Sequence, residues 1–151
     1  MKWLVVHCSA TPVTRDYTVA QLRHDHVDVN GWDDIGYHYY ITKDGRIHAC
    51  RPENVPGAHV KGFNKHSIGI CYEGGIMLEG VDVQVGGKIE HRVRAVPCDT
   101  RTAEQVVSMY ALLSALKLRY PDAKIVGHRD LLRYKTKSCP CFDASREYQT
   151  L

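Results

Sequence analysis

Two short apolar segments near opposite ends of the chain each lead directly to a histidine. Residues 3–6 are rich in β-forming side chains and end at His7, and residues 124–127 form a similar segment that ends at His128. Short apolar runs of this kind are typical of buried strands. If the two strands are parallel neighbours, both imidazoles leave the sheet at its carboxyl edge, where open α/β folds bind ligands. This feature favours an α/β fold with a ligand site at one edge of the sheet.

The other sequence patterns supply the remaining elements of such a fold. Short β-prone segments predict three further strands, at residues 37–41, 46–49 and 67–72. Capping-box spacings predict two helices, over residues 18–30 and 102–120. A chain of 151 residues has the usual size of one domain. We therefore expect a single α/β domain over residues 1–151, with a central mixed β-sheet flanked by helices.

Residues 76–99 stand out because their valines alternate along the chain. Val81, Val83 and Val85 precede the pair Gly86-Gly87, and a second alternating run follows that pair. Alternation on both sides of a glycine pair predicts a β-hairpin, here with one polar face. We expect an extra hairpin at the sheet edge or over a groove, where it sets specificity, binds a partner or only covers the edge.

The chain is rich in metal-binding side chains, with nine histidines and six cysteines. Cys139 follows His128 by eleven residues, so a loop can bring its thiol back to the sheet edge that carries His7 and His128. Two imidazoles and one thiolate suffice for a catalytic zinc ion, which keeps a fourth position open. This soft donor set favours zinc over magnesium or calcium. The spacing alone leaves open the alternative that each of the three is an ordinary packed or polar residue.

Charge and hydropathy exclude several other classes of protein. The formal net charge of +3 is too small for a dedicated nucleic-acid binder, so we expect no nucleic acid as a partner. The longest apolar-rich stretch, residues 110–118, is far shorter than the roughly 17–25 residues of a membrane span. The apolar run before His7 is shorter than the roughly 7–15 residues of a signal peptide. We expect a soluble protein made in the cytoplasm without an export signal.

Five motifs identify a family resemblance. They are HCSAT at residues 7–11, GWDDIGYHYYITKDG at 31–45, GAHVKGFNKHSIGICYEGG at 57–75, GHRD at 127–130 and KSCPCFD at 137–143. Together they resemble the type 2 N-acetylmuramoyl-L-alanine amidases, the family of the small phage lysozymes and the peptidoglycan recognition proteins. The chain is most like the phage enzymes. The motifs cover nearly the whole chain in the family's order, which makes the set specific although no single motif is decisive.

This resemblance implies an active site and a reaction. By position, the family's zinc ligands fall on His7, His128 and Cys139, and its catalytic tyrosine and lysine on Tyr37 and Lys137. The implied activity is a Zn²⁺-dependent peptidoglycan hydrolase. A zinc-bound water, with its pKa lowered to about 7, attacks the amide between N-acetylmuramic acid and the L-alanine of the stem peptide. The alternative is a non-catalytic peptidoglycan-binding, recognition or inhibitory module. Recognition proteins of that kind have lost the cysteine ligand or the tyrosine, and both are present here.

The resemblance also points to residues around the site. His59 is expected to contact the substrate or to lie behind the metal ligands, with an exposed loop histidine as the alternative. Asn64 is expected to contact glycan or peptide, with a role in a turn as the alternative. Cys141 departs from the family motif because it adds a second thiol two residues after Cys139. We expect it to be a bystander, with competition for zinc or oxidation together with Cys139 as alternatives.

The implied partners follow from the same family. The substrate is peptidoglycan or a soluble muropeptide, reached in the cell wall or periplasm after release from the producing cell. Small phage lysozymes can also bind and inhibit their phage's RNA polymerase, but the N-terminal tail that helps them do so is absent from this sequence, so that role is not favoured. We expect a monomer with no membrane span.

Overall fold

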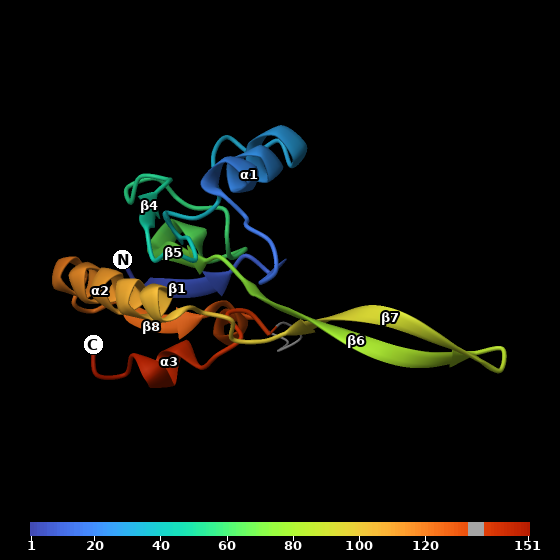
Figure 1. Cartoon of the computed structure of the whole chain (residues 1–151). Coiled ribbons are helices and arrows are strands. Elements are labelled where there is room, and N and C mark those ends of the chain that lie inside the picture. Colours follow the sequence, from blue (N-terminus) through green and yellow to red (C-terminus); the bar gives the residue numbers. More distant parts are fainter. Residues whose placement is uncertain (133–137) are drawn as a thin grey trace.

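The computed structural model describes residues 1–132 and 138–151. In chain order the strands are β1 (Trp3–Cys8), β2 (Thr11–Pro12), β3 (Tyr39–Ile41), β4 (Ile47–Ala49), β5 (Ser67–Tyr72), β6 (Gly75–Val85), β7 (Lys88–Pro97) and β8 (Lys124–Gly127). The helices are α1 (Val19–Arg23), η1 (His24–Val29), η2 (Asn64–His66), α2 (Ala103–Arg119), η3 (His128–Leu131) and α3 (Ala144–Glu147). These elements form an α/β fold with mixed sheets, as the sequence predicts (Figure 1).

The central sheet brings the two histidine-bearing strands together. Its strand order is β4-β3-β5-β1-β8, with parallel pairs throughout except that β4 is antiparallel to β3. β1 and β8 are neighbours, and their last residue pair is Val6 with Gly127. His7 and His128 directly follow these two residues. The predicted parallel pairing is therefore confirmed, and both histidines lie at the carboxyl edge of the sheet.

Alternation of side chains along β1 separates the core from the site. Val6 and Cys8 are buried in the main core together with Leu113 of α2. Because successive side chains of a strand point to opposite faces, His7 faces the other side of the sheet. It is only 1% exposed there. The side chain of Cys8 therefore faces away from that of His7, into the core.

Both predicted helices are present. Residues 19–29 form α1 followed by a π-helical segment, η1, and the chain then turns at Gly31 with a φ of 70°. The second helix, α2, begins after the capping residue Thr102 and ends at Arg119, before Pro121. None of the helices among the described residues combines the length and hydropathy that a bilayer crossing requires.

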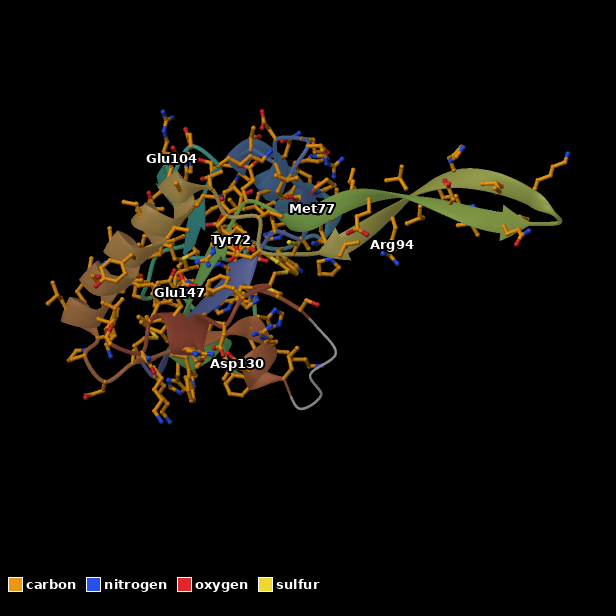
Figure 2. The ribbon with its side chains drawn as sticks, turned by 60° about the horizontal axis from the view of Figure 1, so that its bottom comes forward. Tyr72, Met77, Arg94, Glu104, Asp130 and Glu147 are labelled. Carbon is orange, nitrogen blue, oxygen red and sulfur yellow. The ribbon has the colours of Figure 1, made fainter. Side chains whose placement is uncertain are left out.

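The hairpin of β6 and β7 projects from the body of the protein as a long arm, which Figure 1 shows at the right. The strands pair antiparallel from Ile76–Pro97 to Val85–Lys88, and the turn at Gly86 and Gly87 has φ values of 56° and 80°. Positive φ at both positions is typical of a type I′ turn. Arg94, whose side chain is 64% exposed, lies on this arm clear of the body (Figure 2). The predicted hairpin is present.

The prediction that this hairpin has one polar face is wrong. Val83 lies opposite Glu90, and Val85 lies opposite Lys88. Directly opposed residues share a face, so the valines of β6 share theirs with charged residues of β7. Ile89 and Val93 then fall on the other face, opposite Gln84 and Gly80. The reason is the two-residue turn, since it pairs odd-numbered positions with even-numbered ones and mixes the two patterns on both faces.

A buried glutamine ties α2 to the central sheet. The Nε2 atom of Gln105 donates to the carbonyl oxygens of Ile41 and Glu73, both at 3.0 Å, and its side chain is fully buried. Its Oε1 atom accepts from the N–H of Thr102 at 3.0 Å, which completes a capping box. A second capping box, formed by Thr18 and Gln21 at the start of α1, is exposed. The two capping boxes have the same pair of hydrogen bonds, but Gln105 is buried whereas Gln21 is exposed to solvent.

We predict that Gln105→Met lowers the free energy of unfolding by about 2–4 kcal/mol, because the carbonyl oxygens of Ile41 and Glu73 each lose a donor in a place that water does not reach. Gln21→Met is the matched control and is expected to cost less than about 1 kcal/mol, since water replaces the exposed contact. Urea unfolding followed by circular dichroism measures both values. Equal losses in the two variants would contradict the assigned role of Gln105.

Candidate metal centre and active site

Three metal-binding side chains converge at the carboxyl edge of the sheet. The candidate ligand atoms of His7, His128 and Cys139 all lie within 4.8 Å of one another. Cys139 Sγ is 3.9 Å from His7 Nδ1, and the two imidazole centroids are 4.5 Å apart. These three residues form the predicted cluster, and they come from β1, from the first residue of η3 and from the C-terminal loop.

The donor set and its spacing fit zinc. Bond lengths of about 2.3 Å for Zn–S and about 2.0–2.1 Å for Zn–N separate the donor atoms of a tetrahedral centre by about 3.6 Å. The observed Sγ–Nδ1 separation of 3.9 Å is close to that value. Two imidazoles and one thiolate also leave a fourth position for water or substrate. The cluster of His7, His128 and Cys139 is therefore consistent with a metal site.

Backbone contacts hold the cysteine at the cluster. The N–H of Cys8, next to His7, donates to Cys139 Sγ at 3.2 Å. The N–H of Arg129, next to His128, donates to the carbonyl oxygen of Cys139 at 3.0 Å. A hydrogen bond donated to sulfur favours the thiolate, the form that binds metal. Each histidine is thus tied to the cysteine through the neighbouring residue of its own segment.

Tyr37 lies beside the cluster. Its ring centroid is 5.1 Å from that of His7, and the residue lines the same pocket as the three candidate ligands. Burial raises the pKa of Tyr37 well above its ordinary value. The phenol therefore keeps its proton at neutral pH. The other predicted catalytic residue, Lys137, lies outside the described residues.

His59 and Asn64 both make contacts within the protein. His59 Nδ1 is 2.9 Å from His7 Nε2, and His59 Nε2 is 3.2 Å from Ser67 Oγ. Burial lowers the pKa of His59 to about 3, with the nearby charges of His38 and His128 acting in the same direction. Asn64 Oδ1 accepts from the backbone N–H groups of residues 59 and 60, at 3.0 and 2.9 Å. Their predicted contact with substrate stays a prediction.

A pocket of about 440 Å³ opens over the cluster. Besides the candidate ligands, Tyr37 and Cys141, its lining includes Ser9 and the pair Ile76 and Pro97, with which the β6–β7 arm begins. Sequence reasoning missed these residues as part of the site. The only available signal was the Gly74-Gly75 pair that precedes the arm, because glycines mark a sharp change of chain direction.

Cys141 is oriented toward Cys8 and the arm. Its Sγ atom lies 3.9 Å from Cys8 Sγ and 3.5 Å from the carbonyl oxygen of Gly75. The contact with Cys8, together with burial, raises the pKa of the Cys141 thiol far above its ordinary value. Within the part of the chain that the structure describes, the metal-binding group consists of His7, His128 and Cys139 without Cys141. This arrangement fits the expectation that Cys141 is not a metal ligand.

Two histidines and a cysteine at the carboxyl edge of a mixed sheet, with a tyrosine ring beside them, place the chain in the class of α/β proteins with a candidate metal-dependent active site. Comparison with known proteins identifies the family within this class. Residues 1–142 match the family model for N-acetylmuramoyl-L-alanine amidase. The chain belongs to this amidase family and is an enzyme of that class.

Individual relatives support the same assignment. An endolysin of Klebsiella phage KP32 is 36% identical over 146 residues, which cover 97% of this chain and 84% of the endolysin. The solved structure of an N-acetylmuramoyl-L-alanine amidase from Clostridium intestinale is 27% identical with a TM-score of 0.71, over 97% of this chain and 80% of that one. A Drosophila recognition protein solved in complex with tracheal cytotoxin is 23% identical with a TM-score of 0.67, over 98% and 79% of the two chains, and shares the fold.

The segment before His128 is packed too tightly for a side chain. A Cβ atom at Gly127 would lie 2.6 Å from Pro140 Cδ, in the loop that carries Cys139. The φ of Gly127 is −80°, which any residue can adopt, so the requirement for glycine here is one of space. The Gly127 N–H donates to Asp130 Oδ2 at 2.8 Å, which holds the start of η3; Asp130 is labelled in Figure 2.

We predict that Gly127→Ala weakens Zn²⁺ binding about tenfold, because the new methyl group displaces the loop that carries Cys139. A loss of about tenfold is the lower end of the effect of substituting residues that support metal ligands. Gly80→Ala on the arm is the matched control, since a Cβ there meets nothing within 4 Å. Competition with a chromophoric chelator measures the affinity. Unchanged zinc affinity in Gly127→Ala would show that the packing of this glycine does not position the ligands.

Proposed function

We propose that this chain is a zinc-dependent peptidoglycan hydrolase that cleaves the amide between N-acetylmuramic acid and the L-alanine of the stem peptide. The observation that carries the proposal is the His7–His128–Cys139 cluster in one pocket with Tyr37. Membership of the amidase family supplies the reaction class. The proposed substrate is peptidoglycan or a soluble muropeptide, and the proposed place of action is the cell wall.

The proposed roles follow from the chemistry of each side chain. His7, His128 and Cys139 would hold the zinc ion, which supplies a Lewis acid and lowers the pKa of water to about 7. Tyr37, protonated at neutral pH, would orient the attacking water or relay its proton. Lys137 would stabilise the negative charge that develops on the substrate's carbonyl oxygen, since a fixed positive charge there favours the tetrahedral oxyanion.

The second candidate function is a non-catalytic module that retains peptidoglycan without cutting it. The shared fold of the Drosophila recognition protein favours it. The presence of both Tyr37 and Cys139 in one pocket favours the enzyme instead. The two functions differ in turnover, because only the enzyme releases a new L-alanine amine and a new lactyl carboxylate.

We predict that Cys139→Ala loses both zinc and activity, whereas Lys137→Ala keeps zinc and loses about 10²–10³ in rate, the usual cost of removing one oxyanion-stabilising group. Zinc content is measured by elemental mass spectrometry, and activity by mass spectrometry of digested sacculi. Wild type treated with a chelator is the control. Full turnover in both variants would contradict the assigned site, and zinc-loaded wild type that binds sacculi without cutting them would favour the non-catalytic module.

We further propose that residues 1–151 form one amidase domain and that residues 76–99 are a hairpin inserted into it. The exposure of the arm supports this, because Ile89 and Val93 are 68% and 70% exposed and contribute little to a core. Of the two strands of the arm, only the root lines the pocket, at Gly75, Ile76 and Pro97.

Replacing residues 77–96 with an Asn-Gly turn is therefore expected to leave zinc binding unchanged and to shift the thermal midpoint by less than about 5 °C, since little apolar area is lost from the core. Scanning calorimetry and chelator competition measure the two quantities. A shortened chain that no longer folds would contradict the view of the arm as an insertion.

A further inference from the structure

A chain of three hydrogen bonds runs from the candidate ligand His7 to a backbone carbonyl. His7 Nε2 lies 2.9 Å from His59 Nδ1, and His59 Nε2 lies 3.2 Å from Ser67 Oγ. The Ser67 hydroxyl then donates to the carbonyl oxygen of Phe63 at 3.0 Å. The chain links β1, the 57–60 loop, the start of β5 and the residue before η2, and its far end lies away from the metal donors.

The carbonyl at the end of this chain sets the direction of every bond in it. The carbonyl oxygen of Phe63 only accepts and has two lone pairs: it takes the N–H of His66 at 3.1 Å and, on the other lone pair, the single hydrogen of the Ser67 hydroxyl. Ser67 Oγ must then accept from the Nε2–H group of His59. A neutral imidazole with its hydrogen on Nε2 accepts at Nδ1. His7 therefore carries its hydrogen on Nε2 and donates it to His59.

This direction determines which atom of His7 can bind metal. With the hydrogen on Nε2, the Nδ1 atom presents its lone pair for coordination. Nδ1 is also the His7 atom that lies 3.9 Å from Cys139 Sγ. The hydrogen-bond chain and the ligand geometry therefore agree on the same nitrogen. Metal-binding histidines generally donate their second N–H to an oxygen acceptor, and here the acceptor is a second histidine.

Two glycines make room for the ring of His59. A Cβ atom at Gly57 would lie 2.5 Å from His59 Cδ2, and one at Gly69 would lie 2.7 Å from His59 Cδ2 and Cγ. Gly69 is in the middle of β5, opposite Val5 of β1, where a glycine weakens a strand. Asn64 Oδ1 accepts from the N–H of His59 and so holds its backbone. The imidazole of His59 is therefore closely packed on several sides. A residue that only lined a substrate groove would not need this packing.

We propose that His59 is a positioning residue that, anchored by Ser67, presets His7 to bind zinc through Nδ1. This inference rests on the proposed function, since it concerns the same metal centre. It gives His59 a role behind the ligand rather than in contact with substrate. It also assigns a function to Ser67, which the sequence patterns marked only as part of a motif and as the start of a strand.

The test uses the tautomer of His7 and the affinity for Zn²⁺ as readouts. Long-range ¹H–¹⁵N NMR of the zinc-free chain is expected to show His7 in a single tautomer with its hydrogen on Nε2. His59→Phe keeps a ring but removes the acceptor. It is expected to give mixed tautomers of His7 and a loss of zinc affinity of about 10–100-fold, the usual effect of removing a hydrogen-bond partner of a metal ligand. His59→Asn, which can return an acceptor near the Nδ1 position, is expected to recover most of that affinity.

Two further variants test the role of the anchor and serve as a control. Ser67→Ala removes the anchor of His59 without contacting His7. We expect a second tautomer of His59 and a loss of zinc affinity of about tenfold or less, because Ser67 acts on the metal ligand only through His59. His66→Phe is the matched control on an exposed position and is expected to behave as wild type. Thermal unfolding of each zinc-free variant reports whether it folds.

Wild-type His7 with its hydrogen on Nδ1 in the zinc-free chain, or wild-type zinc affinity and His7 tautomer in a folded His59→Phe, would overturn the inference. Failure of the proposed function is a separate result, seen when wild type binds no zinc or zinc-loaded wild type leaves peptidoglycan uncut. The tautomer is measured without zinc or substrate, so it tests the inference in either case.

Discussion

The parallel pairing of β1 with β8 is the constraint on which the site depends. Its register places Val6 opposite Gly127, so His7 and His128 leave the sheet side by side. Cys139 joins them because the N–H of Cys8, in the same strand, donates to its sulfur. Two strands from opposite ends of the chain thus bring together donors that lie more than a hundred residues apart. The cluster is a direct consequence of strand register.

Close packing around the cluster then decides where glycine is needed. Gly127 leaves room for Pro140, and Gly69 leaves room for the ring of His59. Glycine in a strand costs roughly 0.5–1 kcal/mol relative to alanine, so its presence at these two places indicates a close approach that a methyl group would prevent. The site is therefore held by the space that its neighbours leave as well as by hydrogen bonds.

Much of this fold follows from local patterns. The strands around His7 and His128, and the helices that begin at Thr18 and Thr102, are confirmed because apolar runs and capping boxes act over a few residues. The faces of the β6–β7 arm were predicted wrongly. Each strand alternates as expected, but the two-residue turn pairs the apolar positions of one strand with polar positions of the other. Local patterns do not contain that register.

The sequence by itself determined the donor types, their order along the chain and, through ordered motifs, the amidase family. Only the tertiary structure decided which groups meet. The direction of the His7–His59–Ser67 chain depends on a carbonyl of Phe63 that any residue would supply, so no side-chain pattern encodes it. The same holds for Ile76 and Pro97 at the pocket. Contacts between distant segments depend on strand register and loop path, which are properties of the folded chain as a whole.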